Sequence, residues 1–289
     1  MNRLKTIAII GVGLIGGSLG LALKKIKKYR IIGVGRNLQK LRYARKCGAV
    51  DEIYVDPGEG VKNADIIIFA TPVMTYANIA EGIKPFIKKD AVVFDAGSTK
   101  LEVTGLLTKI FGKNFVGAHP IAGSEKTGVK YARPDLFKNT ICVITPVSQT
   151  DKKAVKIVKN LMSSIGSRII QLSPAEHDKF LALTSHLPHI AAISLVQLLG
   201  PLENEKPLAK FLVGNGFRDT TRISAGSPEV WIDICKTNRE NLIDECGKII
   251  NNISTIKNLL QKEDWERLFI EFDKAKKLRE TILNGTITN

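Results

Sequence analysis

Short runs of apolar, mostly β-branched residues alternate with amphipathic stretches over the first 171 residues of the chain. Runs of this length, bounded by turn residues, are typical of buried strands, whereas the stretch 152–165 carries its apolar residues at helical spacing behind the N-cap residue Asp151. Strands are expected at 6–10, 31–34, 66–69, 92–95, 115–118, 141–145 and 168–171. This alternation predicts a doubly wound α/β domain, with a parallel sheet, over residues 1–171.

The pattern changes at residue 172, where strands give way to helices. Ser173, Pro174 and Glu176 form a capping box with a first-turn proline, and further helices are expected to begin at Ser227 and Asn238. Within the last of these, apolar residues alternate spacings of four and three, at Leu242, Cys246, Ile249, Ile253, Ile256 and Leu260. We therefore predict an all-helical second domain over residues 172–289, and a homodimer through its apolar seam, although a monomeric bundle would show the same stripe.

Composition places the chain among ordinary globular proteins and charge distinguishes its halves. Hydrophobic residues make up 44% of the 289 residues and charged residues 25%. The net charge of +15 lies in the first 171 residues, which carry 28 Lys+Arg against 12 Asp+Glu, whereas the remainder carries 15 against 16. Anionic ligands would benefit from that field, and ordinary surface lysines are the alternative explanation. No zinc-finger spacing or aromatic-interleaved basic stretch indicates a nucleic-acid partner.

The distribution of apolar runs and cysteines bears on the cellular compartment. No signal-type segment and no uninterrupted apolar run of membrane-spanning length is present, so we expect a cytoplasmic protein without a membrane partner. The cysteines Cys47, Cys142, Cys235 and Cys246 are widely spaced and are expected to be reduced.

A glycine-rich loop at residues 11–16 follows the first expected strand and opens an apolar helix. This context is the one that a dinucleotide-binding G-x-G-x-x-G motif requires, so we predict a Rossmann-type domain. Gly11 makes the tight turn, Gly13 admits the pyrophosphate, and Gly16 lets helix and strand approach. Leu14 and Ile15 begin the helix whose positive end faces the phosphates.

The end of the second strand leaves the choice of cofactor open. A carboxylate there would accept hydrogen bonds from both ribose hydroxyls of NAD, but this chain has Gly35 followed by Arg36. Arg36 could bind the 2′-phosphate of NADP, or it could stack on the adenine of NAD. We therefore expect NAD or NADP.

Three further segments follow expected strands, where ligands of open α/β sheets bind. Thr71 and Pro72 follow the strand 66–69, Ser98 lies in the segment 95–100, and His119 lies in the segment 117–125. His119 follows a strand and lies between Gly117 and Pro120. It is a candidate proton acceptor beside the nicotinamide, because neutral imidazole titrates near working pH.

Five motifs in order resemble those of the prephenate/arogenate dehydrogenase family of tyrosine biosynthesis, and they span nearly the whole chain. They are Gly-Val-Gly-Leu-Ile-Gly-Gly-Ser at 11–18, Asp-Ala-Gly-Ser-Thr-Lys at 95–100, Gly-Ala-His-Pro-Ile-Ala-Gly-Ser-Glu-Lys at 117–126, Ser-His-Leu-Pro-His at 185–189 and Gly-Phe-Arg-Asp-Thr-Thr-Arg at 216–222. The resemblance implies an NAD(P)-dependent oxidative decarboxylation of prephenate, or alternatively of arogenate. With no chorismate mutase or regulatory segment recognised, we expect a monofunctional enzyme.

The resemblance also implies roles for individual residues. His119 would take the proton of the substrate's ring hydroxyl as hydride leaves, and Ser98 would orient that hydroxyl. Two substrate carboxylates call for an arginine, and Arg222 matches the family's carboxylate-binding position. His189 would line the substrate pocket. Arg218 is a candidate auxiliary cation and Trp231 a candidate aromatic wall, although surface solvation and helix packing would explain these two equally well. Asp219 could orient Arg222, and Ser124 and Glu125 of the histidine motif are further substrate-side candidates.

The two remaining histidines are not assigned to the chemistry, and two other function classes are alternatives. His186, three residues before His189, is interpreted as structural and His177 as exposed, and no metal is expected because no carboxylate cluster accompanies them. A β-hydroxyacid dehydrogenase or imine reductase also pairs a nucleotide domain with a helical one. A nucleotide-sensing or nucleic-acid-binding protein would explain the charge but would leave Ser98, His119 and Arg222 without a role.

Overall fold

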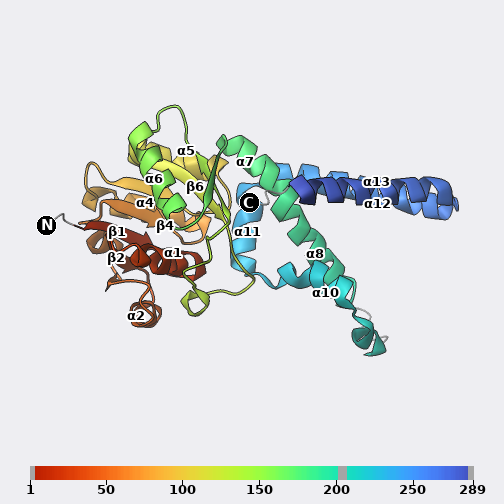
Figure 1. Ribbon diagram of the computed structural model, residues 1–289, viewed down its shortest axis with the longest axis horizontal. Helices are drawn as coiled ribbons and strands as arrows, with labels where there is room; N and C mark the ends of the chain where they lie inside the picture. The colour runs from red at the N-terminus through yellow and green to blue at the C-terminus, as the bar shows by residue number, and fades with distance from the viewer. Residues whose placement is uncertain (1–3, 201–206, 286–289) are drawn as a thin grey trace. The chain divides into compact units, whose positions relative to one another are not determined.

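Eight strands form one continuous sheet in the computed structural model, which describes residues 4–200 and 207–285 (Figure 1). The order across the sheet is β3-β2-β1-β4-β5-β6-β7-β8. The order reverses direction at β1, as in doubly wound folds, so the carboxyl ends of β1 and β4 flank a topological switch point. The strands are β1 Lys5–Ile10, β2 Tyr29–Val34, β3 Glu52–Tyr54, β4 Ile66–Phe69, β5 Val92–Asp95, β6 Phe115–Ile121, β7 Ile141–Thr145 and β8 Arg168–Gln171.

Helices cover both faces of the sheet because each buried strand presents apolar side chains alternately to either side. In β1, Ile7 and Ile9 belong to one core cluster, whereas Ala8 and Ile10 belong to the other. Residues of α1, α2 and α6 pack in the first cluster and residues of α3, α4 and α5 in the second. These helices are α1 Leu14–Lys25, α2 Leu38–Lys46, α3 Pro57–Val61, α4 Tyr76–Ile83, α5 Leu101–Phe111 and α6 Lys152–Ser164. The predicted Rossmann-type α/β fold is confirmed.

Two features of the sheet differ from the prediction. Strand β3 was not predicted, and β7 runs antiparallel to β6, with His119 paired to Val143, whereas a wholly parallel sheet was expected. A parallel connection needs a crossover of a dozen or more residues, usually a helix. Residues 122–140 hold only the short 3-10 turn Val129–Tyr131, and the chain returns in the opposite direction.

The helical half begins with an interrupted helix. The predicted capping box of Ser173 and Glu176 is present at the start of α7 Pro174–Leu181, which continues through a π-helical turn, Ala182–His186, into α8 Leu187–Gln197. A π turn accommodates one extra residue and is common at functional sites, and here it ends two residues before Pro188, which has no N–H to donate.

The helical stretch Pro174–Gln197 is long and apolar enough, by length and composition alone, to cross a membrane. The prediction from uninterrupted apolar runs did not identify it. A third of its most apolar window is buried, and Asp178 accepts hydrogen bonds from the backbone amides of Lys100 and Leu101 in the α/β part. A core helix of a soluble protein meets the same criterion, so the indication for a membrane is weak.

After residue 172 the described chain forms no strands, as the fold prediction requires. The helices and turns are η6 Pro207–Leu212, α10 Asn215–Thr221, η7 Arg222–Ala225, α11 Pro228–Thr237, α12 Arg239–Gln261 and α13 Trp265–Gly285. The chain divides into two compact units, Met1–Asn241 and Leu242–Asn289. The predicted domain boundary between residues 171 and 172 stays a prediction.

Candidate active site

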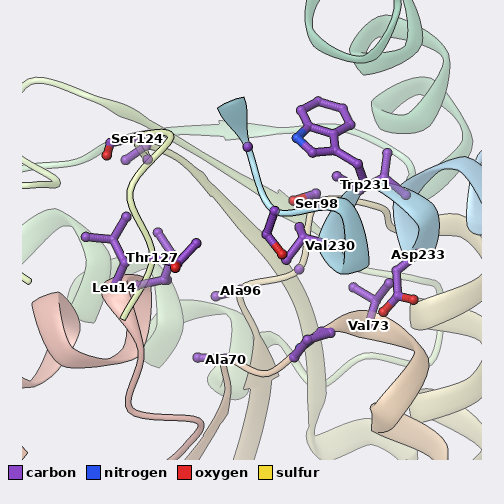
Figure 2. Close-up of a pocket in the computed structure, with 18 of the residues that line it drawn as sticks. Leu14, Ala70, Val73, Ala96, Ser98, Ser124, Thr127, Val230, Trp231 and Asp233 are labelled. Carbon is purple, nitrogen blue, oxygen red and sulfur yellow. The ribbon is translucent and has the colours of Figure 1, made fainter. Parts of the chain in front are cut away.

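A pocket of about 540 Å³ lies within the first compact unit, where the carboxyl ends of β1, β4, β5 and β6 meet helices from the second half of the chain. Figure 2 shows Leu14 and Ala70 on the sheet side and Val230, Trp231 and Asp233, from α11, on the helical side. The predicted site residues that line it are Leu14, Ile15, Thr71, Pro72, Ser98, His119, Ser124, Glu125 and Trp231.

The glycine loop has the geometry that a pyrophosphate requires. Gly11 has a φ of 96°, and a side chain on it would meet the backbone of Ala70 at 2.7 Å. A Cβ on Gly16 would lie 2.1 Å from the carbonyl oxygen of Gly11, so helix and loop approach at the distance that only glycine permits. Gly13, by contrast, faces open space and provides no side-chain cap for α1. The N-terminus of α1 is therefore available to an anionic group, and these residues fit a dinucleotide.

Two other predicted cofactor positions differ in their placement. Thr71, whose hydroxyl lies 2.8 Å from that of Thr75, lines the pocket together with Pro72. Arg36 is exposed directly after β2 and does not line the pocket.

A fully buried ion pair supports the loop that carries Ser98. Lys100 and Asp95 are both 0% exposed and pair through the Lys100 ammonium. Asp95 also accepts hydrogen bonds from the amides of Gly97, at 2.9 Å, and Ala118, at 3.2 Å. Burial raises the pKa of Asp95, and Lys100 opposes that rise. One carboxylate thus fixes the backbone before Ser98 and before His119; the sequence analysis noted the 95–100 motif but not this role.

His119 is held from behind by a second histidine. Its Nδ1 lies 2.8 Å from Nε2 of His177, and Nδ1 of His177 lies 2.7 Å from Oδ1 of Asp178. Burial lowers the pKa of His119 well below its usual value, and His177, Lys100 and His186 add to the effect. His119 is therefore neutral at neutral pH, as a proton acceptor must be.

The expected exposure of His177 was wrong, because its side chain is 0% exposed. The capping box fixes where α7 begins, which turns His177 and Asp178 inward. Asp178 then accepts from the amides at the start of α5, and this contact draws the helix onto the α/β part.

The helical wall of the pocket is built around Trp231. The ring of His189 stacks on it, with centroids 3.4 Å apart and planes within 7°, and the ring of His186 meets it edge-on at 6.1 Å. His189 thus lies behind Trp231, whereas His186 lines the pocket directly. Nδ1 of His186 lies 3.1 Å from the side-chain amide of Asn238. Within the part of the chain that the structure describes, no three potential metal ligands come together.

The predicted carboxylate-binding arginine lies at the edge of the pocket. Arg222 donates a hydrogen bond to Glu125 at 3.0 Å, and its side chain is 61% exposed. A backbone amide contact and Arg222 together lower the pKa of Glu125. Arg218 and Asp219 are exposed and do not line the pocket. Among the described residues Arg222 forms an ion pair with Glu125, and no ion pair with Asp219 accompanies it.

A dinucleotide loop that opens onto a pocket with a neutral histidine defines a nicotinamide-dependent dehydrogenase. Family models described as "Prephenate dehydrogenase, nucleotide-binding domain" and "Prephenate dehydrogenase, dimerization domain" match residues 19–171 and 173–274. The chain belongs to the prephenate dehydrogenase family, as its motifs indicated.

Individual relatives agree with this assignment. Prephenate dehydrogenase of Bacillus subtilis is 39% identical over 97% of this chain and 77% of its own length. The crystal structure of prephenate dehydrogenase from Aquifex aeolicus in complex with hydroxyphenyl propionate and NAD+ has a TM-score of 0.92 at 34% identity, over 97% of this chain and 99% of that one. Synechocystis arogenate dehydrogenase has a TM-score of 0.81 at 28% identity, over 96% and 99%.

Proposed function

We propose that this chain oxidatively decarboxylates prephenate to 4-hydroxyphenylpyruvate, with hydride transfer to NAD+ or NADP+. The observation that carries the proposal is the placement of His119 in the pocket into which the glycine loop opens, where burial lowers its pKa and so favours the neutral ring. When bound, the nicotinamide accepts the hydride from the ring carbon that bears the hydroxyl. The chain's own residues supply the binding, orientation and proton transfer.

His119 and Ser98 act on the ring hydroxyl in this proposal. His119 takes the hydroxyl proton as hydride leaves, because a protonated ketone is a poor intermediate, and Ser98, which also lines the pocket, orients the same hydroxyl. Loss of carbon dioxide then makes the ring aromatic and returns the electron pair to it, and the proton goes back to the ring oxygen.

The two carboxylates of prephenate require positive partners, and we assign one of them to Arg222. Its pairing with Glu125 at the edge of the pocket provides a guanidinium that a substrate carboxylate can engage. Trp231, backed by His189, forms an aromatic wall, and Ser124 lines the opposite side. The roles of Arg218 as an auxiliary cation and of Asp219 as a residue that orients Arg222 stay predictions, and both side chains are exposed.

The cofactor preference can be tested at one residue. Arg36 lies two residues after β2, next to Gly35, which occupies the position that faces the adenine ribose in this fold. If it binds a 2′-phosphate, Arg36→Ala raises the KM for NADP+ about tenfold and leaves that for NAD+ within twofold. Equal changes in both values would assign Arg36 to the adenine ring instead.

The assembly we propose is a homodimer through the helical domain, residues 172–289, in the cytoplasm. The matched dimerization-domain model and the apolar face of the second compact unit support it, since large apolar side chains there are about half exposed or more. They include Ile243, Ile250, Ile253, Leu260, Trp265 and Phe269. Light scattering should give about twice the chain mass of 31.7 kDa.

Arogenate is the alternative substrate, and the likeness to the Synechocystis enzyme is the observation in its favour. The two substrates differ in a side-chain keto or amino group. Steady-state assays with both substrates and both cofactors decide between them, and we expect a kcat/KM at least tenfold higher with prephenate. Absence of turnover with either substrate would overturn the proposed function.

A further inference from the structure

All four histidines of the chain lie around one pocket, yet His177 touches neither the pocket nor any proposed substrate group. It lies behind His119, between that residue and Asp178. Both ring nitrogens of His177 are therefore engaged, Nε2 by His119 and Nδ1 by Asp178, and its protonation pattern determines that of His119.

The contacts of Asp178 determine which ring nitrogen of His177 carries a proton. Its carboxylate accepts from the amides of Lys100, at 2.7 Å, and Leu101, at 2.8 Å, and from Nδ1 of His177, at 2.7 Å. A carboxylate that receives backbone donors on both oxygens is an acceptor only, so Nδ1 of His177 carries a proton.

The remaining tautomers follow from neutrality. Burial lowers the pKa of His177, so its ring is neutral and its Nε2 has a lone pair. That lone pair can only accept, and therefore Nδ1 of His119, 2.8 Å away, is the donor. A neutral His119 protonated on Nδ1 has its lone pair on Nε2, the ring nitrogen for which no partner is found among the described residues.

We propose that His177 is a positioning residue that holds His119 in the Nδ1–H tautomer, so that Nε2 is the base, with Asp178 anchoring His177. The inference rests on the proposed function for its chemistry. The substrate O–H bond breaks, its electron pair becomes the second bond of the new C=O, and the proton joins Nε2 of His119. The same proton returns to the oxygen when the ring becomes aromatic, so the relay has no net proton to dispose of.

The charges around the histidine pair give Asp178 a second purpose. Lys100 and Asp95 face the pair from β5 and α5, His186 faces it from the π turn, and the coulombic effect of Lys100 opposes protonation of both rings. Asp178 favours protonation of His177, and through the hydrogen bond between the rings it stabilises the positive charge that His119 acquires during the reaction.

The tautomer can be observed directly by NMR. Enzyme labelled with ¹⁵N-histidine has only eight ring nitrogens, and the spectrum of His119→Asn identifies those of His119. At pH 7.5 without ligands we expect a protonated Nδ1 and a bare Nε2 on His119. A proton on Nε2 would overturn the proposal. This readout needs no substrate, so it holds whether or not prephenate is turned over.

Kinetics of two substitutions test the functional consequence. His177→Leu removes the acceptor, and we expect kcat to fall about 100-fold while the KM for prephenate and the Kd for NADH stay within twofold. His177→Gln restores an acceptor carbonyl near the position of Nε2, and its kcat should be at least tenfold higher than that of His177→Leu. An unchanged kcat in His177→Leu would overturn the role; should that variant not fold, the wild-type spectrum and His177→Gln still decide it.

Glu176→Ala provides the matched control on the same helix. It removes the capping-box contact of α7 with Ser173 and should lower the thermal midpoint without changing kcat or the tautomer of His119. A fall in kcat as large as that of His177→Leu would show that any loosening of α7 is sufficient, and it would overturn the specific role of His177.

Discussion

The two sides of the pocket are built in different ways. The sheet side depends mainly on backbone geometry: Gly11 and Gly16 permit contacts that any side chain would block, and Asp95 fixes two loops through their amides. The helical side consists of individual side chains, such as Trp231 stacked on His189 and Arg222 paired with Glu125. In our proposal the first side binds a cofactor common to many enzymes, and the second determines which substrate is bound.

Replacing the proton acceptor should give the largest effect, because in our proposal His119 takes the substrate's proton in the reaction itself and does not hold the cofactor. His119→Asn should lower kcat about 1000-fold while the Kd for NADH, measured by fluorescence, stays within twofold. Full turnover in this variant would remove His119 from the mechanism, and a large loss of NADH affinity would assign it to the cofactor side.

Two glycine substitutions separate folding from binding on the sheet side. Gly13→Ala adds a Cβ where no atom of the described chain lies within 4 Å, so it should leave the free energy of unfolding nearly unchanged and raise the Kd for NADH about tenfold or more. Gly16→Ala places its Cβ 2.1 Å from a carbonyl oxygen and should lower the free energy of unfolding by about 1–3 kcal/mol. Chemical denaturation and NADH titration distinguish the two, and identical behaviour of both variants would contradict the geometry.

On the helical side, Arg222→Gln should raise the KM for prephenate about tenfold and change kcat less than threefold. Its guanidinium serves substrate binding in our proposal, and binding that is equal in ground and transition states appears in KM. Arg239→Gln, an equally charged change at an exposed residue outside the pocket, is the control. Equal KM values for the two variants would show that Arg222 does not bind a substrate carboxylate.

Between pH 7.5 and 6.5, acid should have the smallest effect of all on the wild-type enzyme, and the histidines on which it acts lie where the two sides meet. Burial lowers the pKa of His119 and His177, and that of His186 to about 4, so each ring is neutral in the folded state where the unfolded chain is protonated. The unfolded state then binds more protons, so stability is lost as pH falls below about 6.5, by at most about 1.4 kcal/mol per pH unit for each ring, and for His186 the loss continues towards pH 4. Thermal midpoints between pH 7.5 and 5 measure this, and a midpoint independent of pH would contradict it.

The same difference between the two sides explains what the sequence could predict. The strands with apolar runs and the glycine loop were predictable because they obey local rules of periodicity and turn geometry. Strand β3, Glu52–Tyr54, has no such run. The antiparallel β7 had one usable signal, since no helical pattern lies between Ala118 and Ile141.

The residues of the site could likewise be predicted from the sequence only in part. His119 could be predicted because it follows a strand, but His177 is 58 residues away and becomes its partner only when α7 docks through Asp178. Local pattern cannot show that contact. The stacking of His189 on Trp231 likewise joins two helices whose sequences read as ordinary amphipathic segments.

The π turn at Ala182–His186 constrains how this region can change in evolution. Each residue of a helix advances its side chains by about 100° around the axis. Losing or gaining one residue within that turn would leave a continuous helix, but it would rotate Trp231's partner, His189, relative to His177 by that angle. Point substitutions are therefore tolerated there more readily than insertions and deletions, and length variation among descendants of this chain should avoid the segment.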